Sequence, residues 1–163
     1  MNGMALTLRA LHHGETHLSR ELRTVAERHG AEHEVHHVAT YLARWSSDHV
    51  ERIADTAAHY ELNLSEAPSA SHSGFISTLR EKTARAVGRR PEPGLLLLRD
   101  LRDLHLAATE NSLHWEMLAQ AAQAAKDQRL LSLASSCHPQ TLHQMRWTNT
   151  MIKTLCPQVL TSL

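Results

Sequence analysis

The stretch that decides the fold runs from Glu110 to His143 and reads ENSLHWEMLAQAAQAAKDQRLLSLASSCHPQTLH. It joins two runs of residues with helical apolar spacing, and the polar turn at 126–128 separates them. Glu110 lies 16 residues before this turn, and His143 lies 15 residues after it. In an antiparallel helical hairpin, the two side chains are therefore expected at similar heights.

The N-terminal half of the chain repeats this arrangement around a turn at Gly30. Glu15 precedes the turn, and the sequence Ser46-Ser-Asp-His49 follows it. Without a break near Gly30, residues 5–61 would form a single helix far longer than usual. The two halves together predict four long helices in two antiparallel hairpins, at about 5–29, 31–61, 95–126 and 128–156.

The link between the two predicted hairpins is long and differs in composition. Serine, proline, asparagine and glycine flank a short amphipathic segment at 75–87, which we expect to be a short helix. A link of this length can cross the whole bundle, whereas a short one would give simple up-down-up-down order. We therefore predict one all-α domain over residues 1–163, a four-helix bundle with a long crossover that contains the short helix.

Composition and charge exclude several classes of function. The chain has 17 basic and 17 acidic residues, so no basic excess points to nucleic acid or an anionic membrane. It has no apolar run near the roughly 20 residues of a membrane span, and its start shows no signal-peptide pattern. Its two cysteines are too widely spaced for a disulfide within one helix, so together these features favour a cytoplasmic protein. Zero net charge makes a homo-oligomer, such as a dimer, plausible.

The polar residues on the apolar stripes are the candidates for function. Glu15 shares a stripe with Leu11 and Leu18, while Ser46 and His49 lie on the stripe of the second predicted helix. In the C-terminal half, the expected inward stripes are Leu106, Ala107, Glu110, Leu113, His114, Met117 and Ala121, and then Leu133, Cys137, Gln140, His143, Trp147 and Met151. A carboxylate on such a stripe is either a ligand or a poorly placed surface charge.

Four helices with two short turns and one long crossover resemble the ferritin-like bundles of the di-iron carboxylate type. That resemblance implies two metal ions in the bundle core, held by a Glu from each of two helices and a Glu-x-x-His from each of the other two. Glu15 and Glu110 match the lone glutamates, and His49 and His143 match the two histidines. Ser46 and Gln140 stand where the motif glutamates belong, so the metal motif is degenerate.

This departure changes the expected chemistry. Without two of its anionic ligands, the centre is not expected to hold two irons and activate oxygen. Glu15, His49, Glu110 and His143 can still bind a single divalent ion, iron or zinc. The expected function is then metal handling or stress response. Four more residues are candidates either to bind the metal or to hydrogen-bond a bound ligand or water, namely His12, Ser46, His114 and Gln140.

Two alternatives stay open beside metal binding. In the first, Glu15 pairs with His49 and Glu110 with His143 as a buried polar network, and the protein is a metal-free scaffold or interaction module. The second is an oxidase or peroxidase-type enzyme. We rank it last, because few carboxylates remain and the chain has no phosphate loop or nucleophile motif. Trp115 is expected to be plain core rather than a wall of the site.

Overall fold

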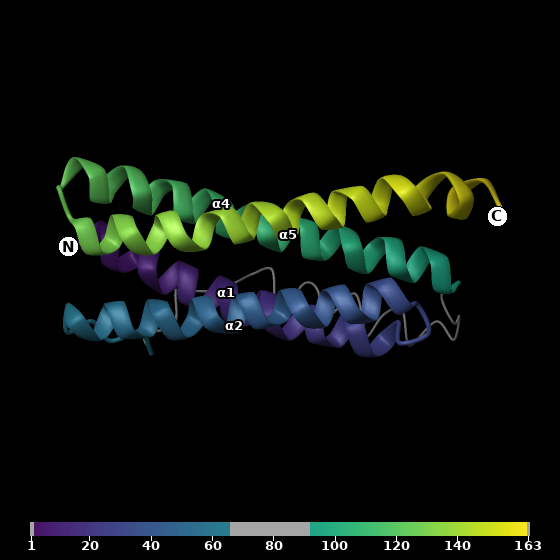
Figure 1. Ribbon diagram of the computed structural model, residues 1–163, viewed down its shortest axis with the longest axis horizontal. Helices are drawn as coiled ribbons and strands as arrows, with labels where there is room; N and C mark the ends of the chain where they lie inside the picture. The colour runs from purple at the N-terminus through teal and green to yellow at the C-terminus, as the bar shows by residue number, and fades with distance from the viewer. Residues whose placement is uncertain (1, 66–91, 163) are drawn as a thin grey trace.

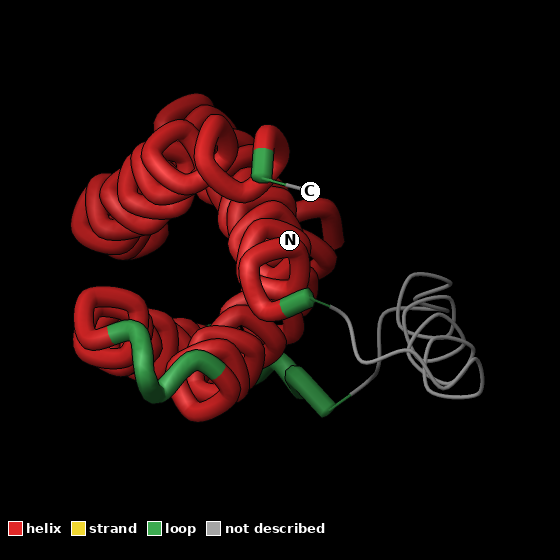
Figure 2. Tube along the Cα trace, turned by 90° about the vertical axis from the view of Figure 1, so that its right-hand side faces the viewer, coloured by secondary structure: helices red, strands yellow, loops and turns green. Residues whose placement is uncertain are grey.

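The computed structural model describes residues 2–65 and 92–162. Within these ranges the chain forms helices α1 (Asn2–Arg28), α2 (His33–His59), α4 (Pro93–Ala124) and α5 (Gln128–Thr161), and it forms no strand. In Figure 2, which looks along the bundle, residues 2–65 and 92–162 are helical apart from the turns and the ends of these ranges. The predicted all-α four-helix bundle is confirmed, while the short helix expected at 75–87 lies outside the described residues.

The helices pack in neighbouring pairs. The most extensive contacts are between α4 and α5 and between α1 and α2, and the pairs meet mainly through α1 and α4. Contact between α2 and α5 is sparser. In Figure 1, α2 ends at the end of the bundle opposite to that at which α4 begins, so α2 and α4 run in the same direction.

The last helix is longer than expected. We predicted an end near residue 156, but α5 continues through Pro139 and Pro157 to Thr161. A proline inside a helix leaves the carbonyl four residues earlier without its N–H partner. Those carbonyls belong to Ser135 and Lys153, which are both exposed, so water can satisfy them.

The α4–α5 turn is fixed by its own backbone and by the end of α2. Lys126 adopts a left-handed conformation with φ 57°, and the N–H of Asp127 donates to the carbonyl of Ala122 at 2.8 Å. The Asp127 carboxylate then caps α5 by accepting from the N–H of Leu130 at 3.1 Å. The same carboxylate accepts a hydrogen bond from the Tyr60 hydroxyl at 2.6 Å, which ties α2 to this turn.

A second polar link lies at the other end of the bundle. Asp100 of α4 is buried and contacts Arg28 at 2.8 Å and His29 at 2.7 Å. Arg28 is the last residue of α1, and His29 lies in the turn that leads to α2. A buried carboxylate is costly unless it is paired, so this link specifies how the first turn sits against the start of α4.

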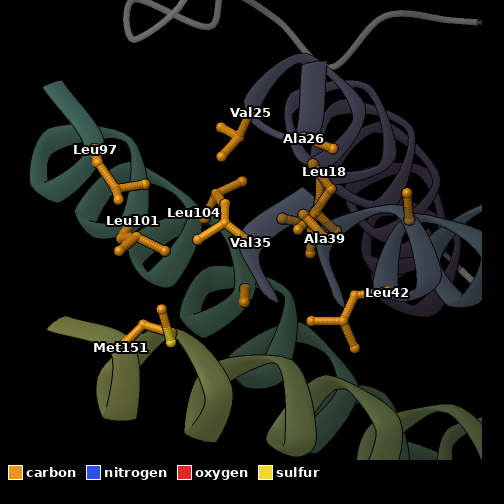
Figure 3. Close-up of a cluster of buried hydrophobic side chains, with 13 residues drawn as sticks. Leu18, Val25, Ala26, Val35, Ala39, Leu42, Leu97, Leu101, Leu104 and Met151 are labelled. Carbon is orange, nitrogen blue, oxygen red and sulfur yellow. The ribbon is translucent and has the colours of Figure 1, made fainter. Parts of the chain in front are cut away.

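The core follows a heptad pattern in all four helices. Buried residues alternate in steps of three and four along each helix, as in coiled coils. They are Leu8, Leu11, Glu15, Leu18, Leu22 and Val25 in α1; Val35, Ala39, Leu42, Ser46, His49 and Ile53 in α2; Leu97, Leu101, Leu104, Ala108, Asn111, Trp115, Leu118 and Ala122 in α4; and Leu130, Ala134, Cys137, Thr141, Gln144, Thr148 and Met151 in α5. Figure 3 shows one apolar cluster of this core, to which all four helices contribute.

The expected inward faces of α4 and α5 are wrong in part. Leu106, Glu110, Leu113 and Met117 of α4 are exposed, and so is His143 of α5. Helix α4 is apolar on two sides, so its helical periodicity fits either face equally well. Its true core face was less obvious because it also carries polar residues, namely Asp100, Asn111 and Ser112.

Candidate functional site

A layer of polar side chains divides the hydrophobic core at mid-height. It consists of Glu15 from α1, Ser46 and His49 from α2, Asn111 from α4 and Gln144 from α5, all of them buried. We call these five residues the polar layer. Along each helix they lie between residues of one apolar cluster and residues of the other. Every helix therefore brings a polar group to the same level of the bundle.

The centre of the polar layer is a buried acid–imidazole pair. Glu15 and His49 are both fully buried, and Glu15 Oε1 lies 3.2 Å from His49 Nδ1. The Trp115 indole N–H donates to the same oxygen at 3.0 Å. The 3.2 Å contact is short enough for an ion pair but is not a hydrogen bond, so His49 Nδ1 has no hydrogen-bond partner in the described chain. The other carboxylate oxygen, Glu15 Oε2, has no hydrogen-bond partner there either.

Gln140 fixes the opposite edge of the His49 ring. His49 Nε2 lies 2.7 Å from Gln140 Oε1. An amide oxygen only accepts, so in this orientation Nε2 carries a proton, and Nδ1 is either protonated or a lone pair. With the amide turned round, Gln140 donates to Nε2 and Nδ1 carries the proton. Where Nδ1 carries no proton, it and Glu15 Oε1 are two acceptors 3.2 Å apart, and a cation beside them would relieve their repulsion.

Helix α5 joins the polar layer through a glutamine. Gln144 Nε2 donates to Ser46 Oγ at 2.9 Å and to the Leu42 carbonyl at 3.1 Å. These bonds tie α5 to α2, and contact between these two helices is sparser than between the other packed pairs. Gln144 Oε1 is buried without a partner in the described chain, which leaves one more free acceptor in the layer.

Helix α4 contributes an asparagine that packs tightly on α1. A Cβ built at Gly14 would lie 2.1 Å from Asn111 Oδ1, so the absence of a side chain at Gly14 makes room for this amide. Asn111 Nδ2 is buried and has no hydrogen-bond partner in the described chain. The two helices approach each other at the level of Glu15, directly beside the acid–imidazole pair.

The structure brings together only half of the predicted ligand set. Glu15 and His49 meet, and Gln140 contacts His49, while Ser46 is bound to Gln144. Glu110 and His143 are exposed and do not join them, which is the main correction to the sequence prediction. The His143 ring instead packs edge-on against Trp45, with ring centroids 5.2 Å apart.

The two further candidate histidines lie outside the acid–imidazole pair. His12 is partly buried, and burial, followed by repulsion from His13, lowers its pKa. His114 is also partly buried, and its Nδ1 has no partner in the described chain. In the described chain neither of them forms a hydrogen bond or ion pair with Glu15 or His49, which are instead contacted by Trp115 and Gln140.

The prediction from the sequence did not include Asn111 and Gln144, and it placed Trp115 in the plain core. All three continue the heptad spacing of their helices, and this spacing was the signal that could have found them. Each lies one residue from a chemically more conspicuous neighbour, namely Glu110, His143 and His114. A step of one residue turns a side chain by about 100° around a helix, so these neighbours point elsewhere.

The residues of the polar layer do not fit a two-metal centre. Such a centre needs several carboxylates and imidazoles converging from four helices, whereas α4 and α5 supply the neutral amides Asn111 and Gln144. Within 2–65 and 92–162, no group of three or more His, Cys, Asp or Glu side chains is arranged to hold a metal ion. The only strong ligands in the layer are Glu15 and His49.

Comparisons with known proteins found no relative. A scan against protein-family models, a search of curated proteins and a search of solved structures each found no match. In the two described ranges, no helix is long and apolar enough to cross a membrane.

Proposed function

We propose that this chain is a ferritin-like bundle that has lost the two-metal centre and acts as a metal-free helical scaffold. The topology supports the ferritin-like assignment, because α2 ends at the opposite end of the bundle from the start of α4 (Figure 1), and residues 60–92 separate the two helices in the sequence. The single observation that carries the loss of the centre is the exposure of Glu110 and His143. Their inward neighbours, Asn111 and Gln144, carry no charge.

The polar layer has a structural role in this proposal. Its hydrogen bonds cross between helices: Trp115 to Glu15, His49 to Gln140 and Gln144 to Ser46. An apolar heptad core can slide or swap partners, and one buried polar position is enough to select a single register. The layer therefore holds the four helices in one alignment, as a protein that presents a fixed outer surface to a partner requires.

Metal analysis of the protein purified after growth in iron and zinc tests this proposal. The scaffold predicts substoichiometric metal, the same in the wild type and in Glu15→Gln/His49→Gln. If the wild type binds approximately one ion per chain and this variant binds none, the scaffold proposal is overturned. The exposed pair Glu110→Ala/His143→Ala is the matched control, and its metal content should equal that of the wild type under either outcome.

A second candidate function rests on the two unpartnered atoms. Glu15 Oε2 and His49 Nδ1 are buried beside each other without hydrogen bonds in the described chain. A carboxylate oxygen and an imidazole nitrogen suit a single zinc or iron ion, and Gln140 would hold the histidine through its other nitrogen. The proposed role would then be storage or sensing of one divalent ion.

Thermal unfolding with added metal separates the two candidates. An ion that binds only the folded protein raises Tm as its concentration rises above Kd. The second candidate predicts a rise with zinc that disappears in Glu15→Gln/His49→Gln and persists in Glu110→Ala/His143→Ala. The scaffold predicts no rise in any of the three proteins. An oxidase or peroxidase activity is not proposed, since Glu15 is the only carboxylate in the polar layer.

A further inference from the structure

Helix α4 carries an apolar row on the side that faces away from the core. Leu106, Leu113 and Met117 are 58%, 55% and 52% exposed, and Leu95 follows the same row at 39%. The steps of seven and four residues place the first three on one side of the helix. A single exposed leucine needs no explanation, but a row along one helix marks a surface that a partner covers. We call these four residues the outer face of α4.

The net charge of this helix differs between its two ends. In the first third, Arg99 and Arg102 have side chains that are 38% and 58% exposed, and they lie 3.6 Å from Asp100 and 3.3 Å from Asp103. From Asp103 to Ala124 the helix has no lysine or arginine, and it carries Glu110 and Glu116, which are both exposed. The helix is therefore neutral in net charge near its start, where it carries the exposed Arg102, and acidic towards its end.

We propose that the outer face of α4 binds the same face of a second copy of this chain, with the two helices antiparallel. A two-fold axis makes one patch complementary to itself. Antiparallel pairing keeps the acidic ends of the two helices apart and brings the exposed Arg102 of each towards the acidic end of the other, whereas parallel pairing would set the two acidic ends together. With Leu106 of one copy opposite Leu113 of the other, Arg102 comes beside Glu116.

This interface extends the proposed function without depending on the polar layer. A scaffold needs a surface for assembly, and α4 supplies it on the side opposite to Asn111 and Trp115. A metal ion between Glu15 and His49 would leave the outer face unchanged, so the two proposals can fail separately.

Analytical ultracentrifugation of the full chain tests the interface. The wild type should sediment as a dimer at micromolar concentration, and Leu106→Glu/Leu113→Glu should be monomeric with an unchanged circular dichroism spectrum. Tyr41→Glu, at an exposed aromatic of α2, is the control and should remain dimeric. A monomeric wild type, or a dimer that survives the leucine changes, would overturn the proposal. If the wild type is monomeric and the Tm falls in the double variant, the outer face is covered within its own chain.

Charge reversal provides a test that needs no change of apolar surface. Arg102→Glu and Glu116→Arg should each weaken dimerisation by about tenfold, because each sets like charges together. The combined variant restores opposite charges across the two-fold axis and should dimerise like the wild type. A combined variant weaker than either single one would rule out the antiparallel pairing.

Discussion

Asn111 of α4 occupies the space that a side chain at Gly14 of α1 would fill, with 2.1 Å between Oδ1 and the position of a Cβ. Asn111 is almost completely buried, so its amide has little room to move aside. The packing of α4 on α1 at this point therefore depends on a glycine in the middle of α1. Both residues adjoin the acid–imidazole pair in sequence or in space.

Replacing this glycine should destabilise the bundle. In an open helix, Gly→Ala is stabilising by roughly 0.5–1 kcal/mol. At Gly14 the overlap with Asn111 reverses the sign, and we expect Gly14→Ala to lower the free energy of unfolding by about 1–3 kcal/mol. Urea denaturation measures the change. Gly3, which has nothing within 4 Å of its Cβ position, is the control, and Gly3→Ala should be neutral or stabilising.

Shortening Asn111 should relieve the effect of Gly14→Ala. In the double variant Gly14→Ala/Asn111→Ala the overlap is gone, so its loss of stability should be smaller than the sum of the two single losses. Equal values for the sum and the double variant would show that the two side chains do not compete for one space.

The Glu15–His49 pair should behave as a coupled unit. Removing one member of a buried pair leaves the other uncompensated, so Glu15→Leu and His49→Leu should each lower the free energy of unfolding by about 3–5 kcal/mol. Glu15→Leu/His49→Leu should cost at least about 1 kcal/mol less than their sum. Urea denaturation at pH 7 measures all three. The same cycle on the exposed Glu110 and His143 should give changes within about 0.5 kcal/mol and no coupling.

The Tyr60–Asp127 link should give a stability difference that depends on pH. The hydrogen bond from Tyr60 is the main cause that lowers the pKa of Asp127. Burial, and then this hydrogen bond, raises the pKa of Tyr60 to about 12. The anionic carboxylate and the neutral phenol are thus the forms that the folded protein favours. Tyr60→Phe should lower stability by about 0.5–1 kcal/mol at neutral pH, a small value because water screens both groups.

The pH limits of that difference follow from the two shifts. The contribution of Asp127 is present above its unfolded pKa near 4 and is lost as the pH falls through its lowered folded value. The contribution of Tyr60 is complete below pH 10 and is lost as the pH rises towards 12. Unfolding curves of both proteins should therefore differ most between about pH 5 and 9. A difference that is constant down to pH 2 would contradict the link.

The two cysteines should differ in reactivity. Cys137 is fully buried, and burial raises the pKa of its thiol to about 12, so almost none is thiolate at pH 8. Cys156 is partly exposed. A thiol-reactive chromophore should label one site per chain quickly and the second only in denaturant, and Cys156→Ser should abolish the fast phase. Fast labelling of both thiols in the native protein would disprove the packing around Cys137.

The N-terminal half of the site could be predicted because its stripes are unambiguous. In α1 and α2 the apolar residues occupy one side, so Glu15, Ser46 and His49 had to point inward with them. The turn positions followed from Gly30 and from the polar residues at 126–128. These local signals were enough to predict four helices and their order.

The C-terminal half could not be predicted in the same way. Helix α4 has leucines on its core side and on its outer face, and α5 lines its core side with Thr141, Gln144 and Thr148. Periodicity alone cannot choose between two apolar faces, and the resemblance favoured the phase that placed Glu110 and His143 inside. Contacts with α1 and α2, which depend on the tertiary structure, decide the choice.

The unequal contacts between the helix pairs have a consequence for access to the interior. The pairs are held mainly where α1 meets α4, and less where α2 meets α5. A brief separation on the weaker side would break the bonds from His49 to Gln140 and from Ser46 to Gln144 while the apolar clusters stay largely intact. Solvent and small ions would thereby reach the middle of the molecule without global unfolding.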